Sequence, residues 1–133
     1  MKKEELSKAY KLHQRWMENE EVLVSLRSKS NISLSKLDAL PHTTGGVSDK
    51  TYQIASTITD LEAEQKRLQR QIQQELKKIM AFLDTVDRQN VRIAMRFRFV
   101  SFMLWKEVAY MMGPLYDETS VRKMVSNYLT KHT

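Results

Sequence analysis

Apolar residues recur every three or four positions along three stretches of this chain, and sparse turn residues separate the stretches. This spacing is typical of amphipathic helices, because a 3.6-residue turn gathers such positions on one face. The sequence therefore predicts an all-α protein. It predicts an N-terminal helix over residues 1–30, a loop over 31–48, a long coiled-coil-like helix over 49–86, and a small helical bundle over 87–133.

The N-terminal helix is followed by a change of composition. Apolar positions in the helix are Leu6, Ala9, Tyr10, His13, Trp16, Met17, Leu23 and Val24. From residue 31 to 48 the pattern fails, because Ser, Asn and Thr accumulate and Gly45–Gly46 gives the backbone freedom to turn. We expect a long loop here, within which a short helix before Pro41 remains possible.

The stretch from 49 to 86 should form one helix of unusual length. Roughly 38 residues at 1.5 Å each give about 57 Å, so the helix needs a partner along its length. The N-terminal helix folded back antiparallel is one candidate, and a second copy of the chain is the other. Gln65 falls on the apolar face. It either fixes register from a core position or lies at a solvated edge, and the sequence does not decide between the two.

Residues 87–133 contain three short helical patterns. Asp87 is a candidate cap for the first, which runs through Val91 and Met95. The second covers about 104 to 112, and Gly113–Pro114 ends it, since glycine tolerates a left-handed cap and proline cannot continue the helix. Asp117 can cap the third. One face of that helix carries Val121, Met124, Val125, Tyr128 and Leu129, and the opposite face carries Thr119, Arg122, Lys123, Ser126 and Thr130.

The charge of the chain is concentrated towards its C-terminal end. The net charge is +6 with an isoelectric point near 9.6, and there is no cysteine. Residues 88–133 carry 8 basic and 3 acidic side chains, an excess of +5. A local basic excess attracts phosphate backbones or acidic surfaces. Without cysteine, neither disulfide nor thiolate chemistry is available.

The chain resembles the RinA/ArpU-type phage and prophage late-gene transcriptional regulators, whose C-terminal portion is similar to region 4 of bacterial sigma factors. The resemblance spans most of the chain. It is carried by Ser25–Arg27, Gly46–Lys50, Arg98–Val100, Trp105–Ala109 and Ser120–Val121. It implies a helical hairpin before a DNA-binding helix-turn-helix that acts on phage promoters or together with host RNA polymerase.

The resemblance also implies roles for individual residues. Trp105, Val108 and Ala109 would form the core of the first helix of the motif, and Glu107 would contact the DNA backbone or a basic neighbour. The residues facing DNA would be Ser120, Arg122, Lys123 and Ser126, with Thr119 on the same helix face. Two features depart from the family. The segment Pro114–Ser120 is about two residues longer than the usual turn, and the connector Ser101–Leu104 has no glycine.

Three arginines spaced four residues apart precede the motif. Arg88, Arg92 and Arg96 would line one helical stripe and repel one another by a few tenths of a kcal/mol per pair unless an anion lies opposite. One interpretation is a ridge that contacts phosphates. The other is a solvated face partly paired with acidic residues, namely Asp84, Asp87 or Glu107.

The residues offer little support for catalysis, cofactors or membranes. His13, His42 and His132 share no metal-ligand spacing, no serine sits in a nucleophile elbow, and Gly45–Gly46 lacks the context of a phosphate loop. Neither a signal peptide nor a membrane span is recognisable, so we expect a cytoplasmic protein. We expect no enzyme activity, no cofactor and no metal.

Two hypotheses follow from the sequence. The first is a sequence-specific regulator that binds double-stranded DNA, with host RNA polymerase as a further partner and a homo-oligomer formed through the long helix. The alternative is a helical protein-interaction module or structural oligomer in which a degenerate helix-turn-helix no longer reads DNA.

Overall fold

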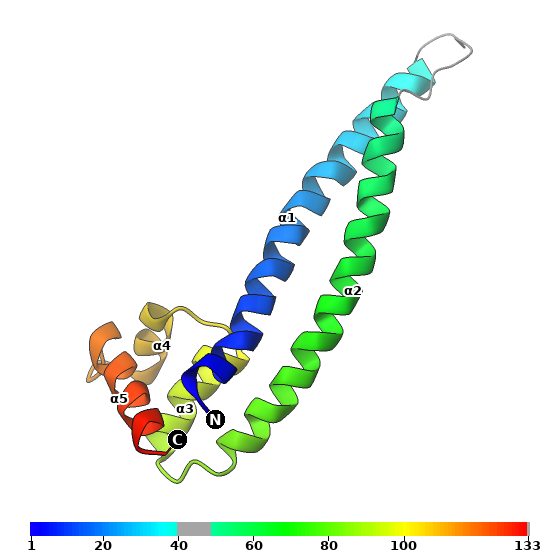
Figure 1. Cartoon of the computed structure of the whole chain (residues 1–133). Coiled ribbons are helices and arrows are strands. Elements are labelled where there is room, and N and C mark those ends of the chain that lie inside the picture. The colour runs from blue at the N-terminus through cyan, green and yellow to red at the C-terminus, as the bar shows by residue number, and fades with distance from the viewer. Residues whose placement is uncertain (40–48, 133) are drawn as a thin grey trace. The chain divides into compact units, whose positions relative to one another are not determined.

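The computed structural model of the chain is all-α, as predicted, and describes residues 1–39 and 49–132, with side chains placed for residues 1–30 and 49–132. A π-helical segment lies between the third and fourth α-helices. The elements are α1 (Lys3–Ala39), α2 (Asp49–Leu83), α3 (Gln89–Met95), η1 (Arg96–Val100), α4 (Trp105–Met112) and α5 (Glu118–Lys131). The α-helices are labelled in Figure 1.

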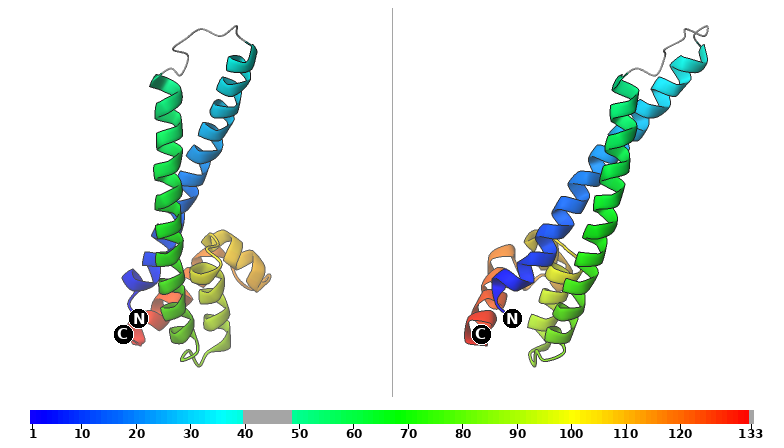
Figure 2. Two further views of the ribbon diagram at one scale, coloured as in Figure 1. Left: turned by 90° about the vertical axis from the view of Figure 1, so that its right-hand side faces the viewer. Right: turned by 45° about the vertical axis from the view of Figure 1, so that its right-hand side comes forward.

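The two long helices form an antiparallel hairpin, which confirms the first of the two partners considered for the long helix (Figure 2). The first helix is longer than expected, because α1 continues to Ala39 and the predicted loop over 31–48 is wrong for residues 31–39. No glycine or proline interrupts the helix there, and adding residues to an existing helix is inexpensive. The remaining part of that loop, 40–48, lies outside the described residues.

The chain divides into two compact units. One, called here the hairpin unit, comprises Gln14–Gln69. The other, called here the bundle unit, comprises Met1–His13 and Arg70–Thr133. The periodicity of residues 1–30 gives no sign of this division, since an uninterrupted helix contributes to both units.

In the hairpin unit, Gln65 occupies a buried position on α2 and is only 7% exposed. Its side-chain oxygen accepts a hydrogen bond from Asn19 Nδ2 at 3.0 Å. Its amide nitrogen donates to the Trp16 carbonyl at 2.9 Å and to Glu20 Oε1 at 3.1 Å. The solvated-edge interpretation of Gln65 is therefore wrong. Because these bonds form at one register only, they favour one alignment of the two helices.

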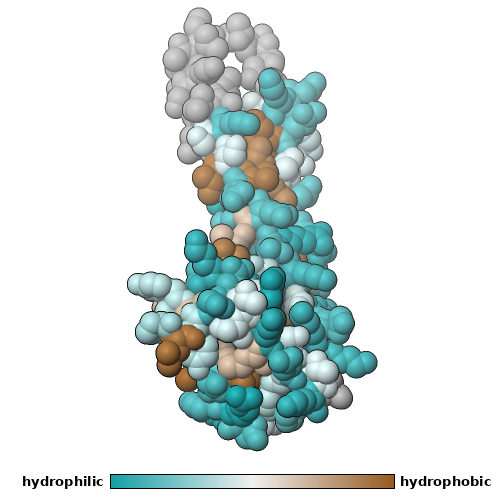
Figure 3. Space-filling view, turned by 90° about the vertical axis from the view of Figure 1, so that its left-hand side faces the viewer, coloured by the Kyte–Doolittle hydropathy of each residue, from teal (hydrophilic) through white to brown (hydrophobic). Residues whose placement is uncertain are grey.

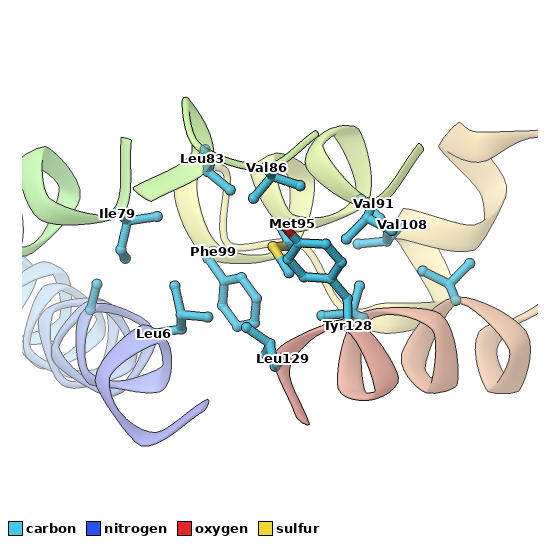
Figure 4. Packing of buried hydrophobic residues seen from close by; sticks show 14 of the residues in the cluster. Leu6, Ile79, Leu83, Val86, Val91, Met95, Phe99, Val108, Tyr128 and Leu129 are labelled. Atoms are coloured by element: carbon cyan, nitrogen blue, oxygen red, sulfur yellow. The ribbon is translucent and has the colours of Figure 1, made fainter. Parts of the chain in front are cut away.

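The core of the bundle unit is assembled from every helix that contributes to that unit (Figure 4). Leu6 from the start of α1 and Leu129 from α5 lie on one side of Phe99, and Met95 lies beside its ring. The first turns of α1 are thus part of the same core as the C-terminal helices. Burial of Leu6 and Met95 is complete, and a buried side chain of this kind contributes about 1.5–3 kcal/mol.

Candidate nucleic-acid interface

Two helices and the turn between them form the candidate interface. Helix α4 ends at Met112, the five residues Gly113–Asp117 turn the chain, and α5 begins at Glu118. Gly113 has φ of +112°, as expected for a helix end that needs glycine. The Tyr116 amide donates to the Gly113 carbonyl at 3.2 Å, which closes the turn.

Asp117 caps α5 as predicted, and Ser120 completes a capping box with it. Asp117 Oδ1 accepts from the Ser120 amide at 2.7 Å, while Ser120 Oγ accepts from the Asp117 amide at 2.9 Å. The Ser120 hydroxyl also donates to the Asp117 carbonyl at 3.0 Å. The resemblance placed Ser120 among the residues that face DNA. Ser120 is exposed, but its amide and hydroxyl both form hydrogen bonds that cap α5.

The two faces of α5 divide as the sequence pattern predicts. Val121, Val125, Tyr128 and Leu129 are buried against the bundle. The opposite face points to solvent: Thr119, Arg122, Lys123 and Thr130 are exposed, and Ser126 is half-buried. Neither Arg122 nor Lys123 forms an ion pair within 4.0 Å among the described residues. The Lys123 charge acts on the Asp117 carboxyl at longer range, but neither cation is held in an ion pair, so both can meet an anionic ligand.

The residues that the resemblance assigned to the first helix of the motif lie in α4. Val108 and Ala109 are buried, and Trp105 is half-buried with its ring edge-on to Phe99 at a centroid distance of 6.2 Å. Glu107 is exposed. The helices α3, α4 and α5 pack on one another, so α5 is held by a small three-helix arrangement.

The three spaced arginines do not behave alike. Arg92 donates twice to the Val86 carbonyl, from Nε at 3.2 Å and from an Nη at 2.8 Å, so its guanidinium is occupied by the backbone. Arg88 and Arg96 are exposed. None of the three forms an ion pair within 4.0 Å with Asp84, Asp87 or Glu107 in the part of the chain that the structure describes.

Helix α3 also begins one residue later than expected. Arg88, not Asp87, occupies the N-cap position, and its side chain makes no capping hydrogen bond. The predicted cap at Asp87 is wrong. Instead, Asn90 Oδ1 accepts a hydrogen bond from the Val91 amide at 2.9 Å, which satisfies one of the free amides of the first turn.

A cluster of aromatic and cationic side chains fixes the connector before α4. The Arg98 guanidinium lies 4.1 Å from the centroid of the Tyr10 ring and 5.0 Å from that of Trp105, and its Nη1 donates to the Met103 carbonyl at 2.9 Å. His13 stacks on Phe102 at 4.2 Å, and partial burial lowers the His13 pKa below 6.5. Sequence reasoning missed this cluster, because Tyr10 and His13 are about 90 residues away along the chain.

Phe102 adopts a backbone conformation that disfavours ordinary side chains. Its φ is +58°, in the left-handed region, at the connector where the family resemblance leads one to expect glycine. A Cβ in this region costs roughly 1–2 kcal/mol. The ring contacts with His13 and Tyr10 hold the residue there despite that cost.

This conformation predicts an inverted order of stability for two variants. Phe102→Gly and Phe102→Ala both remove the ring, but only alanine keeps the strained Cβ, so the glycine variant should be more stable by roughly 1 kcal/mol. Urea unfolding measures the difference. At Lys77, exposed within α2, the same pair should show the usual order, with alanine more stable. Equal or lower stability of Phe102→Gly would contradict the assigned backbone conformation.

The Asp117 cap predicts a pH dependence at acid pH. The hydrogen bond from the Ser120 amide is the main cause that lowers the Asp117 pKa below 3.8, and the Ser120 side chain and the Lys123 charge act in the same direction. The cap therefore stabilises the fold fully above that value, and the stabilisation is lost as pH falls through the lower, folded pKa. Asp117→Ala should reduce Tm at pH 7, and the difference from the unsubstituted protein should shrink towards pH 2. An Asp117 pKa at or above 3.8 by NMR would refute this cause.

The basic excess of the chain lies entirely within the bundle unit. That unit contains 15 Lys and Arg and 8 Asp and Glu, and 15 minus 8 gives a net charge of +7. The hairpin unit contains 7 and 8, a net charge of −1. The unit that presents Arg122 and Lys123 is therefore also the one whose field attracts polyanions.

The described residues were compared with the requirements of a metal site and of a membrane-spanning helix. No group of three or more His, Cys, Asp or Glu side chains there is placed to hold a metal ion. None of the described helices is both long and apolar enough to cross a membrane.

Comparison with protein-family models, with curated proteins and with solved structures found no match to this chain.

Proposed function

We propose that this protein is a sequence-specific regulator that binds double-stranded DNA through α5. The observation that supports the proposal most directly is the outer face of α5, where Arg122 and Lys123 are exposed and unpaired among the described residues. A helix of this kind fits the major groove, which admits one α-helix and presents hydrogen-bonding base edges.

The neighbourhood of α5 suits that docking mode. The turn from Gly113 to Asp117 leaves the first turn of α5 exposed, so residues such as Thr119 and Arg122 can approach base edges. Arg88 and Arg96 provide further unpaired cations in the bundle unit. Contacts between such cations and DNA phosphates add affinity without sequence preference.

The resemblance to RinA/ArpU-type regulators supplies the biological context of the proposal. On that basis the targets are phage or prophage late-gene promoters, and host RNA polymerase is a further partner. The two departures from the family do not remove the outward face of α5. The longer turn contains the Asp117 cap, and Phe102 supplies the positive φ that a glycine would otherwise provide.

The proposal is tested by measuring DNA binding as a function of salt. Fluorescence anisotropy with labelled duplexes should give affinities that fall steeply with NaCl, and a duplex from the region flanking the protein's own gene should bind more tightly than a random one. A footprint on the flanking DNA would locate the site. Weak binding with a flat salt dependence on both duplexes would reject DNA recognition.

A protein-interaction module is the second candidate, and the exposed apolar surface on α4 and on the residues that flank it favours this function. Leu104 is 55% exposed and Met111 is 51% exposed, while Tyr110 and Leu115 are 84% and 92% exposed. Three of them, Leu104, Tyr110 and Met111, line a groove of about 530 Å³. Figure 3, which faces the side on which α4 and α5 are drawn in Figure 1, shows an apolar cluster on a mostly hydrophilic lower surface. Exposed apolar clusters of this kind are typical of protein-binding surfaces.

A further inference from the structure

The start of α1 lies beside the outer face of α5. A groove of about 240 Å³ is lined by Lys2, Lys3 and Glu4 from the N-terminal end and by Ser126, Leu129 and Thr130 from α5. All of these residues belong to the bundle unit, so their placement does not depend on the hairpin unit. The fold thus places Lys2 and Lys3 beside α5.

The groove meets the same helix face that carries Arg122 and Lys123. Ser126 and Thr130 follow those residues by three to eight positions, which at 1.5 Å per residue continues the face along about 12 Å of α5. Lys2 and Lys3 therefore flank the C-terminal half of the proposed reading face. The N-terminal half, with Arg122 and Lys123, is separate from them.

The two lysine side chains are available for an anion. Both are exposed, and neither forms an ion pair within 4.0 Å in the described part of the chain. Among the described residues, the one hydrogen bond at this end that involves a side chain joins the Lys2 backbone amide to Glu5 Oε2 at 3.2 Å, and the Glu5 and Leu6 amides donate to the Lys2 carbonyl, so the ammonium groups are left unused. Lys8, one turn further along α1, differs because its ammonium group pairs with Glu75 at 3.4 Å. Glu4 also lines the groove, so the three charged side chains of the groove sum to +1.

We propose that Lys2 and Lys3 are phosphate-contacting residues of the DNA surface, an inference that rests on the proposed function. When the first turns of α5 enter the major groove, its C-terminal half runs out towards the sugar-phosphate backbone. Lysines beside that half then reach phosphates rather than base edges, and they fix the orientation of the helix without reading sequence.

The test compares salt dependence for matched variants. Lys2→Gln/Lys3→Gln keeps side-chain length and helix propensity while removing two charges. The slope of log affinity against log salt should become shallower by about 1.8, or about 0.9 per phosphate contact, for specific and random duplexes alike. The ratio of the affinity of the unsubstituted protein to that of the variant should therefore fall by about tenfold between 50 and 200 mM NaCl.

Two further variants separate charge at this place from charge in general. Lys2→Arg/Lys3→Arg should retain the slope of the unsubstituted protein, since arginine keeps the charge and also binds phosphate. Lys50→Gln/Lys66→Gln removes two exposed cations from the hairpin unit and should also leave the slope unchanged. Circular dichroism verifies that each variant is folded.

The outcomes distinguish this inference from the proposed function. Steep salt dependence that is identical in Lys2→Gln/Lys3→Gln and in the unsubstituted protein would overturn the lysine assignment and leave DNA binding intact. An equal loss of slope in Lys50→Gln/Lys66→Gln would also overturn it, because the effect would then come from total charge. A flat dependence for the unsubstituted protein would reject DNA binding itself, and the lysine assignment with it.

Discussion

Replacing Arg122 and Lys123 with alanine should weaken binding to the specific duplex by between about 30-fold and about 10⁴-fold. The estimate follows from about 1–3 kcal/mol for each good contact between a cationic side chain and a guanine edge. Both residues lie on the exposed face of α5 without an ion-pair partner in the described residues, so their loss should leave the fold intact.

The decisive measurement is the ratio of affinities for specific and random duplexes. If Arg122 and Lys123 read bases, the ratio should collapse towards one, while residual binding to random DNA persists through other cations. Lys50→Ala/Lys66→Ala is the matched control, because it removes the same charge from exposed positions of the hairpin unit. A folded Arg122→Ala/Lys123→Ala protein with an unchanged ratio would show that α5 does not read the sequence.

Truncating Phe99 should be the most damaging single substitution for stability. Phe99→Ala is expected to lower the free energy of unfolding by about 3–5 kcal/mol, because it opens a cavity in the core of the bundle unit. The Phe99 ring is 3% exposed, lies among Leu6, Met95 and Leu129 (Figure 4), and meets the Trp105 ring edge-on.

Tyr110 on α4 provides the control for that substitution. It is also aromatic, but it is 84% exposed, so Tyr110→Ala should change the free energy of unfolding by less than about 0.5 kcal/mol. Urea titrations monitored by circular dichroism compare the two variants. A cost below about 1 kcal/mol for Phe99→Ala would mean that the core of the bundle unit does not depend on this ring.

The two long helices were largely predictable from local pattern. The sequence predicts a helix over 49–86, and α2 spans Asp49–Leu83. The misjudged end was that of α1, where Ser and Asn between residues 28 and 33 look like loop composition. In the structure these residues continue the helix, because a helix that has already formed tolerates residues that would not start one.

The geometry of α5 and of the turn before it was predicted in part. The exposed face of α5 followed from the alternation of aliphatic and cationic residues, and Gly113 and Asp117 marked the turn that precedes it. The use of the Ser120 hydroxyl in the cap and of the Arg92 guanidinium on a carbonyl did not follow. A serine hydroxyl or an arginine guanidinium can either face solvent or form a hydrogen bond with the main chain. Only the position of the neighbouring backbone decides which of the two occurs.

The order of apolar and polar residues alone determined that the chain is helical, where most helices begin or end, and which side of α5 is cationic, since all three depend on contacts within a few residues. The tertiary structure decided the rest. It placed Lys2 and Lys3 beside α5, Arg98 between Tyr10 and Trp105, and the strained Phe102 against His13. These arrangements join residues far apart along the chain, and burial of a shared core, which no local pattern encodes, is what brings them together.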